Sequence, residues 1–90
     1  MTTIATIKAG QSVKAGYKSF LTDCEFLGFS TDHDIPAFNT LAEIRSQVAD
    51  KEIYKAIFRD LDGNYTWVAY FWNGRWRVGT SADTLKLAAA

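Results

Sequence analysis

The sequence predicts an α+β fold in which a three-stranded antiparallel β-meander carries two α-helices on one face. The first observation is that Asp62-Gly63 and Asn73-Gly74 separate three runs of strand-forming residues between Glu52 and Thr80. Such dipeptides readily adopt the positive φ angles of tight hairpin turns. The second is that two segments upstream have apolar residues at helical spacing. Packing these helices on the sheet would bury their apolar stripes together with the apolar face of the sheet.

The two hairpins assign the intervening side chains to the two faces of the sheet. Two-residue turns pair Leu61 with Asn64 and Trp72 with Arg75, and side chains then alternate between the faces. The predicted core face comprises Tyr54, Ala56, Phe58, Trp67, Ala69, Phe71, Trp76 and Val78. The predicted outer face comprises Ile53, Lys55, Ile57, Arg59, Thr66, Val68, Tyr70, Trp72, Arg75 and Arg77.

The segment before these strands is predicted to contain an edge strand and a helix. Residues 3–8 are β-branched at four of six positions, which favours a short fourth strand at the edge of the sheet. Apolar residues from Val13 to Leu27 then recur at the spacing of one helical stripe. Ser12 is positioned to cap this first helix, and Gly28 to end it.

A loop and a second helix are predicted next. Residues 29–39 lack periodicity, and Pro36 is incompatible with an ordinary helix across them. Thr40-Leu41-Ala42-Glu43 matches the capping box, in which the Thr hydroxyl and the Glu carboxylate accept hydrogen bonds from backbone N–H groups of the first turn. The helix is expected to end near Asp50. Residues 81–87 are too few to decide whether a last helical turn follows.

Length and composition indicate one small globular domain over residues 1–90. The chain is 48% hydrophobic and 14% aromatic, which exceeds the content typical of disordered chains. Ten basic residues balance ten acidic ones, so overall charge does not favour nucleic acid or an anionic membrane. No apolar run reaches the length of a membrane span. The final Ala88-Ala89-Ala90 resembles a cloning-site join, with native helix as the equal alternative, and is left out of the functional argument.

Arginine and aromatic residues alternate on the predicted outer face and form the candidate binding site. Its members are Lys55, Arg59, Tyr70, Trp72, Arg75 and Arg77. Arginines make charge-assisted contacts with acidic groups, and aromatic side chains anchor protein interfaces. We therefore predict a small non-catalytic protein-binding module: an adaptor, an inhibitor or a homodimer. The alternatives are a nucleic-acid-binding face that stacks on bases, and side chains that simply cover their own sheet.

An acidic segment suggests how a second copy of the chain would bind. Asp23, Glu25, Asp32 and Asp34 lie in a stretch without Lys or Arg, and this stretch complements the basic sheet face. Phe26 lies off the predicted helical stripe. It adds apolar area to this surface if the helix extends to Leu27, and it folds inward if the helix ends earlier.

No metal site or cofactor is predicted. Asp32-His33-Asp34 has metal-ligand character, but zinc sites usually draw at least three ligands from spaced positions, so these carboxylates are expected to cap a turn. Asp60, Asp62 and Asn64 match the start of an EF-hand loop. Tyr65 stands where that loop requires Gly, and Phe71 where it requires Glu, so the match fails.

The chain also lacks the residues of a recognisable enzyme. Cys24 and His33 are the only thiol and imidazole, and Cys24 lies on the predicted apolar stripe, where a thiol is buried and inert. No phosphate-binding loop, nucleophile elbow or dinucleotide fingerprint is present, so no small-molecule substrate is evident. A single cysteine permits no internal disulfide, which is consistent with a reducing cytoplasm.

Overall fold

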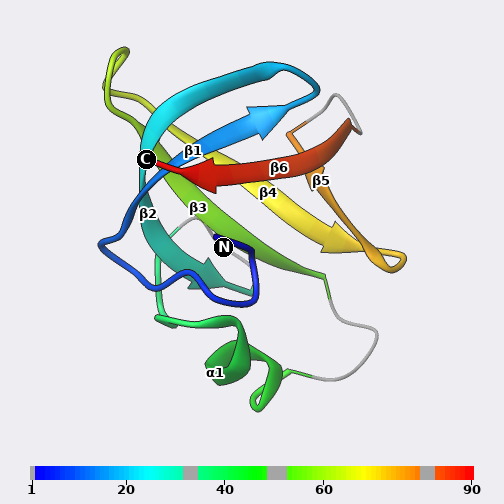
Figure 1. Cartoon of the computed structure of the whole chain (residues 1–90). Helices are drawn as coiled ribbons and strands as arrows, with labels where there is room; N and C mark the ends of the chain where they lie inside the picture. The colour runs from blue at the N-terminus through cyan, green and yellow to red at the C-terminus, as the bar shows by residue number, and fades with distance from the viewer. Residues whose placement is uncertain (1, 32–34, 49–52, 80–82) are drawn as a thin grey trace.

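The chain folds into a closed antiparallel barrel of six strands in chain order, with the first paired to the last (Figure 1). A computed structural model describes residues 2–31, 35–48, 53–79 and 83–90. The strands are β1 (Ser12–Tyr17), β2 (Phe20–Ser30), β3 (Tyr54–Asp60), β4 (Thr66–Trp72), β5 (Arg75–Val78) and β6 (Asp83–Ala89). A short helix, α1 (Leu41–Arg45), lies between β2 and β3. The predicted α+β fold class, a meander with two helices, is therefore wrong.

The predicted first helix is instead the hairpin of β1 and β2. Tyr17 pairs with Phe20 across a tight turn, in which Lys18 has a φ of 52°. The apolar residues of this segment also fit the two-residue alternation of strands, since Val13 and Ala15 are buried within β1. Tertiary pairing with β3 and β6 decides between the two periodicities, because it buries one face of each strand in the barrel.

Two glycines of this segment have strand roles that the helix prediction did not include. A Cβ on Gly16 would overlap the backbone carbonyl of Phe20 on the neighbouring strand. Gly28, predicted to end a helix, lies at a β-bulge in β2 with a φ of 131°. There a Cβ would stand 2.8 Å from the carbonyl oxygen of Phe38, so this glycine permits the close approach of the following loop.

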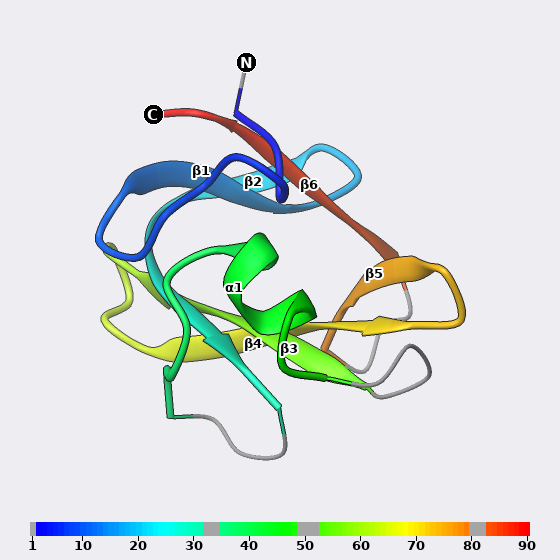
Figure 2. The same ribbon diagram turned by 90° about the horizontal axis from the view of Figure 1, so that it is seen from below.

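The second predicted helix exists but is shorter than expected. The Thr40 side chain accepts a hydrogen bond from the Glu43 backbone N–H at 3.3 Å. The Glu43 carboxylate accepts from the Asn39 N–H at 2.9 Å, whereas a capping box predicts the Thr40 N–H as the donor. The helix ends at Arg45, and Asp50 lies outside the described residues. Figure 2 shows α1 across one end of the barrel rather than on the face of an open sheet.

The predicted edge strand at residues 3–8 is a turn. The Thr3 carbonyl accepts hydrogen bonds from the N–H groups of Thr6 and Ile7, both at 3.0 Å. The Thr3 and Thr6 hydroxyls lie 3.2 Å apart, so β-branched residues here make local hydrogen bonds. The turn places Ile7 in the core, fully buried. At the other end of the chain, β6 completes the barrel in the segment left undecided between helix and coil.

The predicted pairing of β3, β4 and β5 is confirmed. Tyr54 pairs with Phe71, and Phe71 with Trp76. Asn73 and Gly74, with φ of 53° and 79°, form the expected two-residue turn. The first turn differs in type: it is a four-residue loop, 61–64, with its positive φ at Asn64. The predicted turn at 62–63 and the observed loop at 61–64 have the same midpoint, so β3 and β4 keep the predicted register.

The predicted core face points into the barrel. Tyr54, Ala56, Phe58, Ala69 and Trp76 are buried, whereas Trp67, Phe71 and Val78 are half-buried. The rings pack closely: the Phe58 and Trp67 centroids are 4.7 Å apart at an interplanar angle of 19°. The opposing strands and α1 cover this face in place of two helices. Within the described ranges, no helix has the length and apolar character needed to span a membrane.

Candidate binding sites on the barrel

The predicted binding residues lie on the outside of β3, β4 and β5. Lys55, Tyr70 and Arg77 are directly opposite one another on adjacent strands, and Trp72 is opposite Arg75 in the next outward row. The structure therefore brings these five residues together, and we call them the basic-aromatic patch. Ile57 has the same outward register but is fully buried, so it adds nothing to the exposed surface.

Trp72 is the most exposed aromatic side chain of the patch. It is 53% exposed, and the Arg77 guanidinium carbon lies 4.9 Å from the centroid of its ring. Arg77 also donates a hydrogen bond from Nη1 to the backbone carbonyl of Trp72. These two contacts hold the arginine and the ring together on the surface, which limits the side-chain freedom that binding would otherwise remove.

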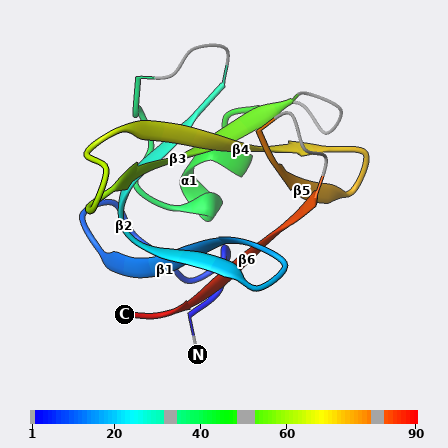
Figure 3. The ribbon, with the colours of Figure 1, turned by 90° about the horizontal axis from the view of Figure 1, so that it is seen from above.

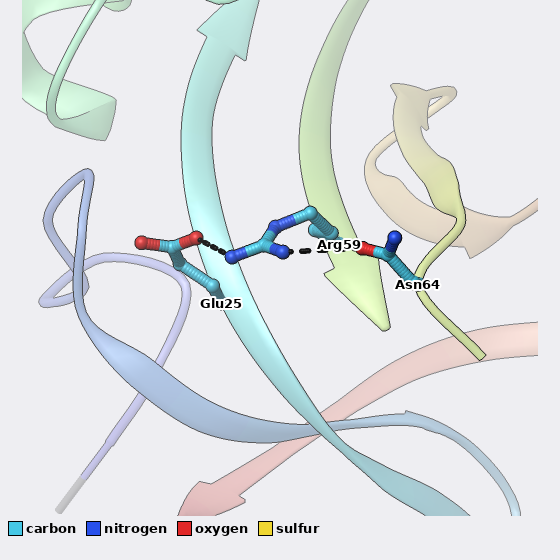
Figure 4. Close-up of polar contacts among 3 residues, drawn as sticks. All are labelled: Glu25, Arg59 and Asn64. Carbon is cyan, nitrogen blue, oxygen red and sulfur yellow. Dashed lines mark hydrogen bonds and ion pairs between the residues drawn. The ribbon is translucent and has the colours of Figure 1, made fainter. Parts of the chain in front are cut away.

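Arg59 is separate from the patch. It lies four residues from Lys55 along β3, or about 13 Å at the usual strand rise. Its Nη2 contacts the Glu25 carboxylate at 2.7 Å, and its Nη1 donates to the Asn64 side chain at 3.2 Å (Figure 4). Arg59 therefore links β2 to the β3–β4 loop. Its charge is paired within the chain, but its side chain is 41% exposed, so its place in the binding site stays a prediction.

The same ion pair changes the predicted acidic surface. Glu25 is half-buried and pairs with Arg59 of its own chain, and Phe26 is fully buried, so Phe26 adds no apolar area to a surface for a second copy. Asp23 is exposed on β2. Asp32 and Asp34 lie outside the described residues. The structure therefore describes only one exposed carboxylate of the proposed acidic segment.

A pocket of about 380 Å³ lies at the end of the barrel opposite α1, and we call it the barrel mouth. Figure 3 views this end, where the β1–β2 turn and the β3–β4 loop lie above the strands and α1 closes the far side. Its lining includes Tyr17, Phe20, Thr22, Tyr65, Trp67 and Val78. Phe20 and Tyr65 are 66% and 56% exposed, so two aromatic residues form an open rim.

A buried carboxylate lies beside this pocket. Asp60 is 3% exposed, and its Oδ1 accepts hydrogen bonds from the N–H groups of Asp62 and Gly63, both at 2.8 Å. The Gly63 hydrogen bond is the main reason that the pKa of Asp60 lies below its ordinary value, and the Thr22 and Tyr65 side chains lower this pKa further. The negative charge of Asp60 in turn raises the pKa of Tyr65. The mouth thus has an ionised carboxylate next to its aromatic lining.

Cys24 is confirmed as a buried residue and supports the same pocket. Burial raises the pKa of its thiol, so the unreactive neutral form is favoured. The hydroxyl of Thr22, which lines the mouth, lies 3.4 Å from its sulfur. Cys24 therefore lies directly behind Thr22 in the wall of the mouth. His33, its predicted partner in the catalytic alternative, lies outside the described residues.

The metal-ligand candidates have different outcomes. Asp32-His33-Asp34 lies outside the described residues. In the parts of the chain that the structure describes, no group of three His, Cys, Asp or Glu side chains is arranged to hold a metal ion. Asp60 belongs to the loop that resembles the start of an EF-hand, and its Oδ1 is occupied by two backbone N–H groups. Local hydrogen bonding therefore accounts for the acidic pattern of this loop.

Comparison with protein-family models, with curated proteins and with solved structures finds no match to this chain. Functional inference therefore depends on the geometry of the patch and the mouth. The sequence predicted the patch but not the mouth, because helical spacing placed Tyr17 and Phe20 on one stripe and nothing in the sequence placed Tyr65 near them. The alternation of Val13, Ala15 and Tyr17 is the sequence signal of a strand with one face turned into the barrel.

Proposed function

We propose that this protein is a small binding module without catalysis of its own, and that it docks an acidic protein surface onto the basic-aromatic patch. The single observation that carries the proposal is the outward placement of Trp72, half exposed and stacked with Arg77. Tryptophan and arginine are the residue types that most often dominate binding energy at protein interfaces. A preorganised pair of this kind is a suitable anchor.

The charge of the surrounding strands favours an acidic partner. Lys55 lies on the outward face of β3, and Arg75 and Arg77 lie on that of β5. The register places no Asp or Glu on the outward faces of β3, β4 and β5. Complementary potentials speed encounter and disfavour wrong partners. A second copy of this chain is one acidic partner that the proposal allows. The free thiol of Cys24 is consistent with a cytoplasmic protein, and we include that compartment in the proposal.

Comparative capture from the source cell tests the proposal. The immobilised protein is compared with Trp72→Ala and with the double variant Arg75→Glu, Arg77→Glu, and bound proteins are identified by mass spectrometry. We expect an acidic protein to be retained by the original chain and lost from both variants. Leu61→Ala is the matched control, because Leu61 is 44% exposed but lies in the β3–β4 loop. Equal retention by correctly folded patch variants would overturn the proposal.

Salt dependence distinguishes a protein partner from the nucleic-acid alternative. The Arg77–Trp72 pair also offers a platform on which a base would stack. A labelled single-stranded oligonucleotide is titrated at low and at high salt. Phosphate contacts would produce binding that weakens steeply as salt rises. Such binding, abolished by Arg75→Glu with Arg77→Glu, would replace the proposed protein partner with nucleic acid, whereas no binding at low salt removes the alternative.

A further inference from the structure

We propose that the barrel mouth is a second binding site, separate from the basic-aromatic patch, and that it accepts an alkylated ammonium group. This chemistry is shared by small quaternary ammonium compounds and by methylated lysine side chains. The mouth opens between the β1–β2 turn and the β3–β4 loop, whereas Trp72 and Arg75 flank the β4–β5 turn. Ligand binding at the mouth can therefore be tested separately from partner binding at the patch.

Aromatic rings from three strand ends supply the walls of this site. Trp67 stacks on Phe58 and also lines the pocket. Tyr17 and Phe20 stand 5.8 Å apart at an interplanar angle of 50°, and Tyr65 lines the same pocket. The electron-rich faces of such rings attract cations, and aromatic cages are a known means of binding quaternary ammonium groups.

The acidic groups around the mouth favour a positive ligand. Asp60 lies directly behind Thr22 and Tyr65, and its lowered pKa keeps it ionised at neutral pH. Asp62 is in the adjoining loop, and Asp83 is paired in register with Val78 of the lining. Lys18 on the β1–β2 turn is within 4.0 Å of Asp83 and offsets part of this charge. Arg59 also reaches the β3–β4 loop at Asn64 but is paired with Glu25, so we take the buried carboxylate of Asp60, beside Thr22 and Tyr65 of the lining, as the negative charge that acts on the ligand.

The burial of Asp60 selects an alkylated ammonium over a bare one. Its carboxylate is 3% exposed and already accepts two backbone hydrogen bonds, so it acts through its field and not through direct contact. A lysine ammonium or a guanidinium entering an aromatic pocket would lose hydrogen bonds to water without replacement, which is costly. A trimethylammonium group has no N–H to satisfy. A pocket of about 380 Å³ has room for it.

The lining is held in place without a ligand. The Trp67 ring is held by its stack on Phe58, at 4.7 Å between the ring centroids. The Tyr65 hydroxyl is tied to Asp60, and its ring packs against Gly63 closely enough that a Cβ there would stand 2.7 Å away. A preformed aromatic site loses little conformational freedom on binding, which favours recognition of a small ligand.

Titration of the full chain with matched ligands tests charge and alkylation separately. The probes are choline, its neutral isostere 3,3-dimethylbutan-1-ol, and the N-acetyl amides of trimethyllysine and lysine. Binding is followed by calorimetry and by the NMR signal of the Trp67 indole N–H. We expect the neutral isostere to bind about 5- to 30-fold more weakly than choline, and lysine more weakly than trimethyllysine by a similar factor.

The relative affinities also identify the source of the ligand. Choline binding as tightly as the trimethyllysine amide indicates a free small molecule, whereas a clear preference for the trimethyllysine amide indicates a modified protein. Both outcomes support the site. Equal binding of choline and its neutral isostere would overturn the proposal, as would equal binding of the two lysine amides or no binding of any cationic probe.

Variants locate the ligand within the mouth. Phe20→Ala removes an aromatic ring that is 66% exposed, so we expect about 5-fold weaker choline binding in a chain that still folds. Ile35→Ala is the control, because Ile35 is 68% exposed and is not part of the lining. Asp60→Asn removes the charge and should weaken choline without weakening the neutral isostere. Unchanged choline affinity in folded Phe20→Ala would place the cation elsewhere and contradict the proposal.

Discussion

The two ends of the barrel are built in different ways. The closed end is filled by Leu41 and Ile44 of α1 together with Ile7, all of which are 4% exposed or less. The open end has exposed Phe20 and Tyr65 above the buried carboxylate of Asp60. Apolar burial therefore stabilises one end, while hydrogen bonds position the residues of the other. This difference leaves aromatic surface at the mouth available to a ligand without weakening the core.

The largest expected effect is at the closed end. Ile44→Ala should lower the free energy of unfolding by about 2–5 kcal/mol, because it removes a fully buried side chain and leaves a cavity. Urea unfolding followed by circular dichroism measures the change. Phe20→Ala at the mouth serves as the comparison and should change stability by only about 0.5 kcal/mol. Similar losses in the two variants would show that the ends do not differ in this way.

A smaller effect, dependent on pH, is expected from Asp60→Asn. The folded state lowers the pKa of Asp60 below its ordinary value of 3.8, mainly through the Gly63 N–H. Its contribution to stability is therefore present above pH 3.8 and is lost as the pH falls through the folded-state pKa. Asparagine still accepts hydrogen bonds but does not titrate. Unfolding measured against pH should be less acid-sensitive in the variant, and an unchanged acid profile would count against the assigned role.

The smallest expected effect concerns the cap of the helix that closes the barrel. Thr40→Ala removes the acceptor for the Glu43 N–H and should cost about 1 kcal/mol. Thr40→Ser retains the hydroxyl and should recover most of that stability. Thermal melts of the two variants make the comparison. If the alanine variant were as stable as the serine variant, α1 would depend on packing alone.

Strand pairing was predictable where the turn chemistry was strong. The Asn73-Gly74 turn fixed the pairing of Trp72 with Arg75, and the inward and outward faces of β3, β4 and β5 followed. The Thr40 cap was also visible in the sequence. The β1–β2 hairpin was not, because its turn at Lys18 has no Asn-Gly or Asp-Gly signal, and its apolar residues satisfy helical and strand periodicities alike.

The two candidate sites were predictable to different degrees, because turn signals in the sequence reveal only the pairing of neighbouring strands. The patch follows from local alternation within two hairpins, so most of its residues were identified. The ion pair of Arg59 could not be predicted, because Glu25 is distant in sequence and comes into reach only through the pairing of β2 with β3. The mouth combines Phe20 with Tyr65 and Val78, and only closure of the barrel brings these residues together.

The pairing of β1 with β6 has a consequence for how the molecule forms. Val13 lies opposite Ala89, so the strand pair that closes the barrel joins segments separated by nearly the whole length of the chain. Contacts of such long sequence separation are slow to establish, and until they exist β1 and β5 each present an unpaired edge. Folding should therefore be limited by the docking of β6, and association between chains would be most probable before that step.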